Sequence, residues 1–192
     1  MRGKMSDELR RIAEGVRVVG FESERNISQI TIQDVEDFYW EAMQTVGWPT
    51  EKVKPSHSLM PGYKCLRHRT GKFTFVDEWS SHANGRSEGK TTIWFGLNPI
   101  WVMSYCGWYP KEVIPFLKVA LMEMIEARRF MGGRGNNYYY DENYPDLAYY
   151  NDVERAKLFP GFVGEEKIYK KNDDGSDDTL VGLHRYQGMS LI

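Results

Sequence analysis

The feature that most limits the fold of this chain is an internal similarity between two pairs of segments. Residues 89–94 and 164–169 each begin with glycine and, after three further residues, continue with isoleucine and an aromatic residue. Residues 101–108 and 182–189 each contain a tyrosine, one intervening residue, a glycine and a large apolar residue. The spacing of about 80 residues is longer than the repeat of a solenoid protein. The similarity therefore predicts two units of the same fold, joined around a pseudo-twofold axis.

An amphipathic helix is predicted ahead of each of these units. Thr31 is the expected N-cap of the first helix, because Asp34 completes a capping box and apolar residues then recur at helical spacing up to Gly47. The second helix is expected within residues 111–131, and Pro115 is compatible only with its first turn. Each unit would therefore have one helix to cover one face of its strands.

Alternation of apolar and polar residues predicts strands after each helix. The predicted strands cover residues 63–68, 73–79, 91–95, 100–106, 146–151, 158–163, 165–170 and 179–186. The polar segment 80–90 is predicted as a loop, and the pair Asp174-Gly175 is typical of a hairpin turn.

These elements predict an α+β domain of two pseudo-repeats, each an amphipathic helix followed by an antiparallel β-meander, packed as one domain. Residues 1–31 are assigned to an N-terminal helix and edge segment, residues 32–110 to the first repeat and residues 111–192 to the second. One helix on one meander leaves sheet edges and apolar surface uncovered, and a second copy covers both. The junction of two such units forms a groove, which is a common place for ligands.

Composition argues against several classes of function. The chain has 25 basic and 27 acidic residues, a net charge of −2, and lacks the basic surplus typical of nucleic-acid binders. Its apolar stretches are far shorter than the roughly 20 residues that a membrane span needs. Cys65 and Cys106 lie far apart with no metal-ligand spacing, which is typical of reduced thiols in the cytoplasm. We therefore expect a cytoplasmic protein with neither nucleic-acid nor membrane partners.

A series of short motifs resembles a known family. A Pro-x-Trp-x-Met-x-Tyr-x-Gly run at residues 99–107 precedes the predicted helix, and an Arg-Gly pair follows it at residues 134–135. A Phe-x-Gly-x-Glu-x-Ile block at residues 162–168 and a Tyr-x-Gly segment at residues 186–188 complete the order. Together with the aromatic-x-aromatic-x-Asp strand at residues 73–77, this order is similar to the family of bacterial domains catalogued as domain of unknown function 5680. The resemblance covers residues 32–192.

This resemblance implies more about the fold than about the function. Members of the family sometimes lie behind a DNA-binding helix-turn-helix domain, which implies a sensing or partner-binding role, but the family supplies no activity to carry over. The chain also departs from the family pattern. It has Thr92 where the first glycine block usually has glutamate, and Gly182-Leu183 where members often have Tyr-Glu.

Candidate ligand-binding residues are the large or charged side chains expected at the groove between the two units. Aromatic residues make up 14% of the chain, and such side chains suit ligand clefts because they combine apolar surface with a polar group. The candidates are Trp101, Met103, Tyr105, Asp77, Arg134, Glu166 and Tyr186. No residue is assigned a catalytic or metal-binding role and no cofactor is predicted, because the four histidines lack a metal-ligand spacing.

Three hypotheses about function follow. The favoured one is a non-catalytic module that binds a small molecule or a protein partner, and it predicts a concave aromatic pocket without strongly perturbed carboxylates. The second is a small hydrolase that uses Asp77 or Glu166 with Tyr105, Arg134 or His184, and it predicts a cleft with convergent titratable groups. The third is a homo-oligomeric interaction protein, which predicts a flat apolar patch.

Overall fold

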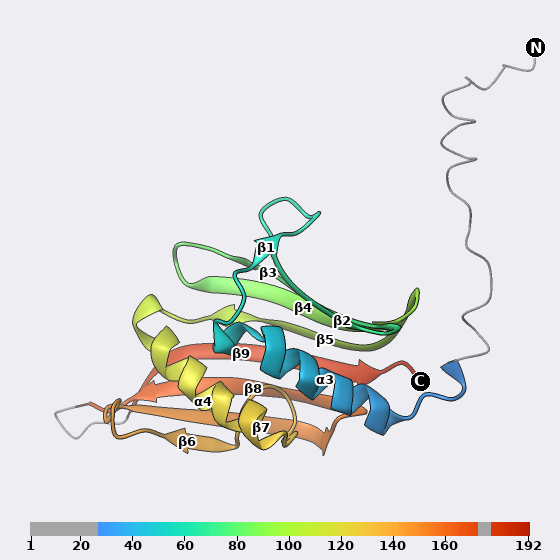
Figure 1. The fold of residues 1–192 in the computed structure, drawn as a ribbon. Helices are drawn as coiled ribbons and strands as arrows, with labels where there is room; N and C mark the ends of the chain where they lie inside the picture. Colours follow the sequence, from blue (N-terminus) through green and yellow to red (C-terminus); the bar gives the residue numbers. More distant parts are fainter. Residues whose placement is uncertain (1–26, 173–177) are drawn as a thin grey trace, which may run out of the picture.

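The chain folds into an α+β structure made mostly of sheet. The computed structural model describes residues 27–172 and 178–192, and the elements below are those of these two ranges. They comprise two α-helices, two short 3₁₀-helices and one antiparallel sheet of nine strands (Figure 1). The predicted α+β class is confirmed. Most of the predicted N-terminal segment, residues 1–26, and the predicted Asp174-Gly175 turn lie outside the described residues.

The nine strands form one sheet in which neighbours in the chain are mostly neighbours in space. The strands are β1 (Ser56–His57), β2 (Lys64–Thr70), β3 (Phe73–Ser81), β4 (Arg86–Phe95), β5 (Asn98–Trp108), β6 (Tyr138–Tyr140), β7 (Leu147–Leu158), β8 (Gly161–Lys170) and β9 (Thr179–Ser190). Their order in the sheet is β1-β2-β3-β4-β5-β9-β8-β7-β6. Strands β1 to β5 and β6 to β9 are therefore two meanders, joined at the middle of the sheet by the antiparallel pair β5–β9.

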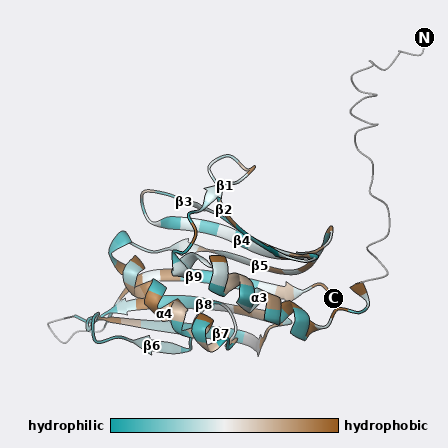
Figure 2. Cartoon of the chain, viewed as in Figure 1, coloured by the Kyte–Doolittle hydropathy of each residue, from teal (hydrophilic) through white to brown (hydrophobic). Residues whose placement is uncertain are grey.

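Helices α3 (Ile32–Val46) and α4 (Ile114–Ala127) lie on the same face of this sheet (Figure 1). The predicted capping box of α3 is present, with Thr31 and Asp34 bonded to each other's backbone amides. The predicted position of Pro115 in the first turn of α4 is confirmed as well. Apolar and polar residues alternate along both helix ribbons (Figure 2), as expected for helices with one face against a sheet.

The space between the helices and the sheet is filled by aromatic side chains. Trp101 of β5 is fully buried, and its ring stacks on Phe159 with centroids 4.9 Å apart. Tyr39 of α3 packs against both of these rings. A second buried group surrounds Phe116 of α4 and Tyr149 of β7. The two groups place the core on the helical face, so alternate residues of each strand point into it.

The structure corrects three sequence-based predictions. Segment 80–90 is not all loop, because β4 begins at Arg86 and its glycine at position 89 accommodates a tyrosine ring from the next strand. Residues 158–163 are not one strand, because β7 ends at Leu158 and β8 starts at Gly161 after a tight turn. Residues 138–140 form an edge strand, β6, that alternation over three residues is too short to indicate.

Candidate functional site

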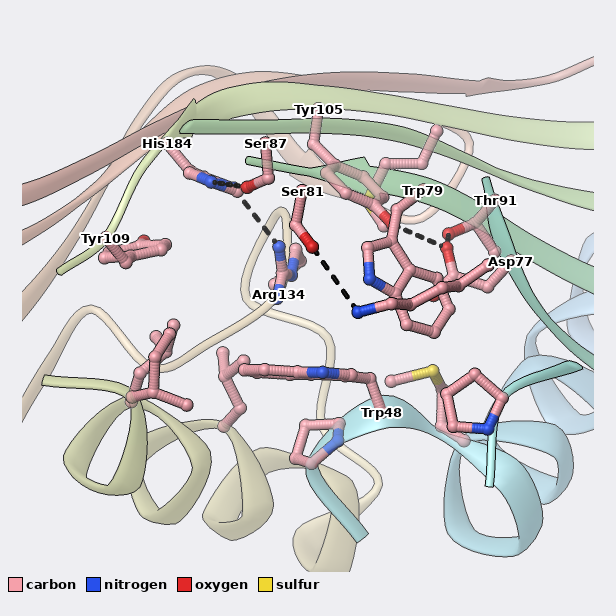
Figure 3. A pocket seen from close by; sticks show the side chains of 18 of the residues that line it. Trp48, Asp77, Trp79, Ser81, Ser87, Thr91, Tyr105, Tyr109, Arg134 and His184 are labelled. Atoms are coloured by element: carbon pink, nitrogen blue, oxygen red, sulfur yellow. Dashed lines mark hydrogen bonds between the residues drawn. The ribbon is translucent and has the colours of Figure 1, made fainter. Parts of the chain in front are cut away.

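A pocket of about 480 Å³ lies between the inner face of the first meander and the helical layer (Figure 3). Its walls are largely aromatic, and the rings come from both layers. The aromatic lining residues include Tyr39, Trp48, Trp79, Tyr105, Tyr109 and His184. Pockets that bind small molecules usually have volumes of about 300–1,000 Å³ and predominantly apolar walls.

Strand alternation places the polar lining residues of the sheet. In β3, Asp77, Trp79 and Ser81 are spaced two apart, so they share the inner face. In β4, Ser87 and Thr91 occupy the same face for the same reason. The sheet therefore presents a short row of hydroxyl and carboxylate groups to a pocket with largely aromatic walls.

Gly89 decides how Tyr105 enters this pocket. A side chain at position 89 would place its Cβ 2.5 Å from the hydroxyl oxygen of Tyr105. Because glycine leaves this space empty, the Tyr105 ring lies across β4 and its hydroxyl donates to Asp77 Oδ1 at 2.8 Å. The glycine therefore permits a hydrogen bond that spans three strands.

Asp77 keeps one acceptor atom for the pocket. Its Oδ1 receives both the Tyr105 hydroxyl and the Thr91 hydroxyl, the latter at 2.9 Å. No described residue donates to Oδ2. Every buried side-chain oxygen or nitrogen of the described residues has a hydrogen-bond partner, so Oδ2, which has none, is not fully buried and is open to the pocket. Burial raises the pKa of the Asp77 carboxyl, while its two hydrogen bonds and Arg134 oppose the rise.

Arg134 brings a positive charge to the opposite side of Tyr105. Its Cζ lies 5.0 Å from the centroid of the Tyr105 ring, in the geometry of a cation–π contact. Its Nε lies 3.9 Å from Oε1 of Glu166, a fully buried carboxylate that also accepts the hydroxyls of Tyr109 and Tyr149. Burial raises the pKa of Glu166, and Arg134 opposes the rise. The guanidinium therefore lines the pocket while its charge is balanced from behind.

The protonation of His184 follows from its neighbours. Burial and the adjacent Arg134 lower the pKa of His184 to about 3, so the ring is neutral. Arg134 Nη1 lies 3.5 Å from Nδ1, and because arginine only donates, Nδ1 is the acceptor. Nε2 therefore carries the proton and donates to Ser87 Oγ at 3.0 Å. The hydroxyl hydrogen of Ser87 is then free to point to another acceptor.

The entrance of the pocket is basic. The exposed titratable side chains among the lining residues are His57, Lys64, His82 and Lys111. Lys64 Nζ lies 3.5 Å from Ser81 Oγ, and neither lysine forms an ion pair with another residue of the described ranges. The pocket therefore leads from an entrance with positive charge to an interior that holds Asp77 and Arg134.

Four of the seven candidate residues meet at this pocket. Asp77, Met103, Tyr105 and Arg134 line it, although they come from two strands and a loop. The other three lie elsewhere on the inner face. The indole of Trp101 donates to the carbonyl of Phe159 at 3.0 Å, Glu166 lies behind Arg134, and the Tyr186 hydroxyl is buried against Asn151.

Several lining residues were not among the candidates. Trp79 and Ser81 share the alternation of Asp77, so this spacing in β3 was a signal that could have identified them. Trp48 follows the glycine that ends α3, in the 3₁₀-helix η1 (Trp48–Thr50), and nothing in the local sequence indicates its direction. Ser87 and Tyr109 reach the site only through the pairing of strands distant in sequence.

Known proteins provide no further evidence about this site. Comparison of the chain with family models, curated proteins and solved structures finds no match. Within residues 27–172 and 178–192, no group of three or more His, Cys, Asp or Glu side chains is placed to hold a metal ion. None of the helices in these ranges is long and apolar enough to cross a membrane. The functional argument therefore depends on the geometry of the pocket.

Proposed function

We propose that the chain is a non-catalytic module that binds a small molecule in the pocket of Asp77, Tyr105 and Arg134. One observation carries this proposal: an aromatic cavity of about 480 Å³ holds a carboxylate oxygen that no described residue satisfies. A ligand that donates a hydrogen bond to Oδ2 of Asp77 would satisfy the acceptor that the described chain leaves open to the pocket. The sensing role implied by the resemblance to the domain of unknown function 5680 family fits such a module.

The aromatic walls supply the affinity in this proposal. Removal of apolar surface from water is worth roughly 25 cal/mol per Å², so a flat ring that buries about 150 Å² gains about 4 kcal/mol. Trp48 and Trp79 provide such surface from opposite layers of the pocket, as Figure 3 shows. The polar groups of the interior would then fix the orientation of the ring.

The same geometry argues against the hydrolase hypothesis. A serine nucleophile needs a histidine that accepts its proton, whereas His184 donates to Ser87 and has a pKa of about 3. A glycosidase needs two carboxylates across one cleft, whereas Glu166 is fully buried and does not line the pocket. The binding hypothesis itself predicted a pocket without strongly perturbed carboxylates. Burial raises the pKa of Asp77, while its hydrogen bonds and Arg134 oppose the rise.

The homo-oligomer hypothesis finds less support than the binding hypothesis. It predicted a flat apolar patch, and the outer face of the sheet is the surface left without a helix in the described chain. This face carries charged side chains, including Glu165, which pairs with Lys167 of its own strand and with Arg185 of β9. Charged cross-strand pairs are typical of a solvated sheet face.

We further propose that the two meanders, each with its helix, are copies of one ancestral unit. Tyr105 and Tyr186, which are equivalent in the sequence similarity, are Cα partners across β5 and β9. Each ring lies against a glycine of the neighbouring strand, Gly89 or Gly164, whose added Cβ would meet the hydroxyl oxygen at 2.5 Å. A twofold axis through the tyrosine pair accounts for both contacts.

The binding proposal is tested by a thermal-shift screen of the full chain against ring-containing metabolites. A ligand that binds only the folded state at 100 times its Kd stabilises it by about 2.7 kcal/mol, so we expect a rise in Tm for some compounds. Trp48→Ala should abolish the rise. Trp94→Ala, in β4 but outside the pocket lining, should retain it. No shift with any compound, or a shift that Trp48→Ala leaves intact, would overturn the proposal.

A further inference from the structure

The charges around the pocket restrict the chemistry of its ligand beyond the proposed binding function. The chain as a whole is slightly acidic, with a net charge of −2. The lining reverses this balance, because it contains Lys64, Lys111 and Arg134 but a single acidic residue, Asp77. Glu166 balances the charge of Arg134 from outside the lining, so the surplus lies with the two lysines. A cavity that concentrates positive charge in an acidic protein attracts anions.

The two lysines at the entrance are available to a ligand. Lys64 has a hydroxyl, that of Ser81, as its hydrogen-bond partner, and Lys111 has no side-chain hydrogen bond to any described residue. Two acidic side chains of the neighbouring strands β3 and β4 contact other groups: Glu78 accepts from Ser58, and Glu88 from Tyr63. Neither ammonium group is therefore neutralised by a carboxylate of the described chain.

The interior of the pocket is complementary to a different chemical group from the anion expected at the entrance. Asp77 Oδ2 requires a donor, whereas the guanidinium of Arg134 and the hydroxyl of Ser87 offer hydrogens to an acceptor. Tyr105 connects the two sides, because its hydroxyl bonds Asp77 while Arg134 lies over its ring. An N–H beside a C=O, as on the edge of a lactam or amide heterocycle, satisfies both sides at once.

Trp48 indicates that the ligand is flat. The ammonium group of Lys118 covers its ring, with Nζ 5.0 Å from the centroid, and Glu51 holds that lysine in place. Figure 3 shows the indole edge-on at the helical side of the pocket, with Trp79 and Arg134 across the cavity from it. A ring that enters between these side chains would stack on the indole.

We infer that the ligand is a planar heterocycle with an N–H/C=O edge and an anionic substituent. The edge lies against Asp77, Arg134 and Ser87, the ring on Trp48, and the phosphate or carboxylate at Lys64 and Lys111. The inference rests on the proposed binding function and names the class of molecule that the pocket accepts. A phosphate and a carboxylate make the same contacts with two ammonium groups, so both belong to this class.

Two matched pairs of probes test the class by isothermal titration calorimetry with the full chain. Guanosine 5′-monophosphate against guanosine represents the phosphate, and orotate against uracil represents the carboxylate. We expect the anion of at least one pair to bind about tenfold more tightly than its neutral partner, because it alone can pair with the two ammonium groups at the entrance. Added salt should reduce this ratio.

Variants at the entrance assign the effect to the two lysines. The double variant Lys64→Ala/Lys111→Ala should weaken binding of the anion about tenfold and change binding of the neutral partner less than twofold. Lys90→Ala removes the same charge from β4 outside the pocket lining and should leave both affinities unchanged.

The outcomes separate this inference from the proposed function. Equal affinity for anion and neutral partner, or a loss of affinity equally large in Lys90→Ala, would overturn the anionic class while the pocket remains a binding site. The same holds if neither pair binds but other compounds raise the Tm in a way that depends on Trp48. If no compound of any class binds, the inference and the proposed function both fail.

Discussion

Two tyrosine clusters, one in each half of the sheet, share a geometry but differ in what surrounds them. Tyr105 and Tyr186 are Cα partners at the centre of the sheet, and each lies against a glycine of the next strand. Each hydroxyl then bonds a side chain two strands away, Asp77 in the first cluster and Asn151 in the second. The first cluster opens into the pocket, whereas the second is closed by residues 132–135.

Because of this difference, the two clusters have separate roles in the structure. The side-chain amide of Asn151 donates to the carbonyls of Gly132 and Gly135, at 2.7 and 2.8 Å, and so holds both ends of the loop that carries Arg134. An aspartate at position 151 has no hydrogens for these carbonyls. In the first cluster the carboxylate of Asp77 bonds no loop of the described chain, and its second oxygen faces the cavity. One half of the sheet therefore anchors the arginine that the pocket in the other half uses.

The largest effect is expected when the asparagine of the second cluster is replaced by aspartate, the residue that the first cluster contains. Asn151→Asp replaces two donors with a buried carboxylate that faces two carbonyl oxygens, next to Glu166 on the paired strand. We expect a loss of about 3–5 kcal/mol in the free energy of unfolding, the usual cost of an uncompensated buried charge. Urea denaturation measures it.

A matched substitution on the surface controls for the change of amide to acid. Asn84 accepts a hydrogen bond from the backbone of Arg86 through its side-chain oxygen, and an aspartate retains this acceptor. Asn84→Asp should therefore change the free energy of unfolding by less than about 0.5 kcal/mol. A loss below 1 kcal/mol for Asn151→Asp would show that the second cluster does not hold the loop as its contacts indicate.

Removal of each tyrosine hydroxyl should have a smaller and unequal effect. Tyr186→Phe leaves the buried side-chain oxygen of Asn151 without its donor, and we expect a loss of about 2 kcal/mol. Tyr105→Phe should cost only about 1 kcal/mol, because Asp77 keeps the Thr91 hydroxyl and water can reach it through the pocket. Urea denaturation of both variants compares them directly. Equal losses would mean that the first cluster is as closed as the second.

The sequence predicts the elements of this fold better than it predicts the site. Local patterns were sufficient for α3, whose capping box and apolar spacing both lie within its own residues. Gly89 was misread because glycine and polar neighbours are typical of loops, whereas here glycine makes room for Tyr105. That reason depends on the pairing of β4 with β5, which no local pattern contains.

The candidate site was predicted in part for the same reason. Asp77, Met103 and Tyr105 were among the large or charged side chains expected at the groove, and strand alternation places them on the common face that lines the pocket. Glu166 was expected in the cleft, but its position behind Arg134 depends on how residues 132–135 close over the second half. Trp48 could not be identified, because its direction depends on the packing of η1 against α4.

The smallest effect is expected for Asp77, the carboxylate of the first cluster, and it concerns how the stability of the fold depends on pH. Burial raises the folded-state pKa of Asp77 above its ordinary value of 3.8, so the folded state holds this proton more tightly than the unfolded state. The stability that the proton contributes is complete below pH 3.8 and is lost as the pH rises through the raised pKa. Asp77→Asn removes this dependence. Glu166, whose pKa is also raised, titrates in both proteins and cancels in the difference.

We therefore expect Asp77→Asn to gain stability relative to the natural chain as the pH rises from acidic to neutral conditions. Urea denaturation of both proteins across this range measures the difference. A difference that does not change with pH, or that falls as the pH rises, would contradict the raised pKa. If the gain is found, the carboxylate of Asp77 lowers the stability of the fold at neutral pH, whereas a side-chain amide such as that of Asn151 would not do so at this position. The natural choice of aspartate at this position then requires a benefit outside folding, and a ligand that donates to Oδ2 supplies one.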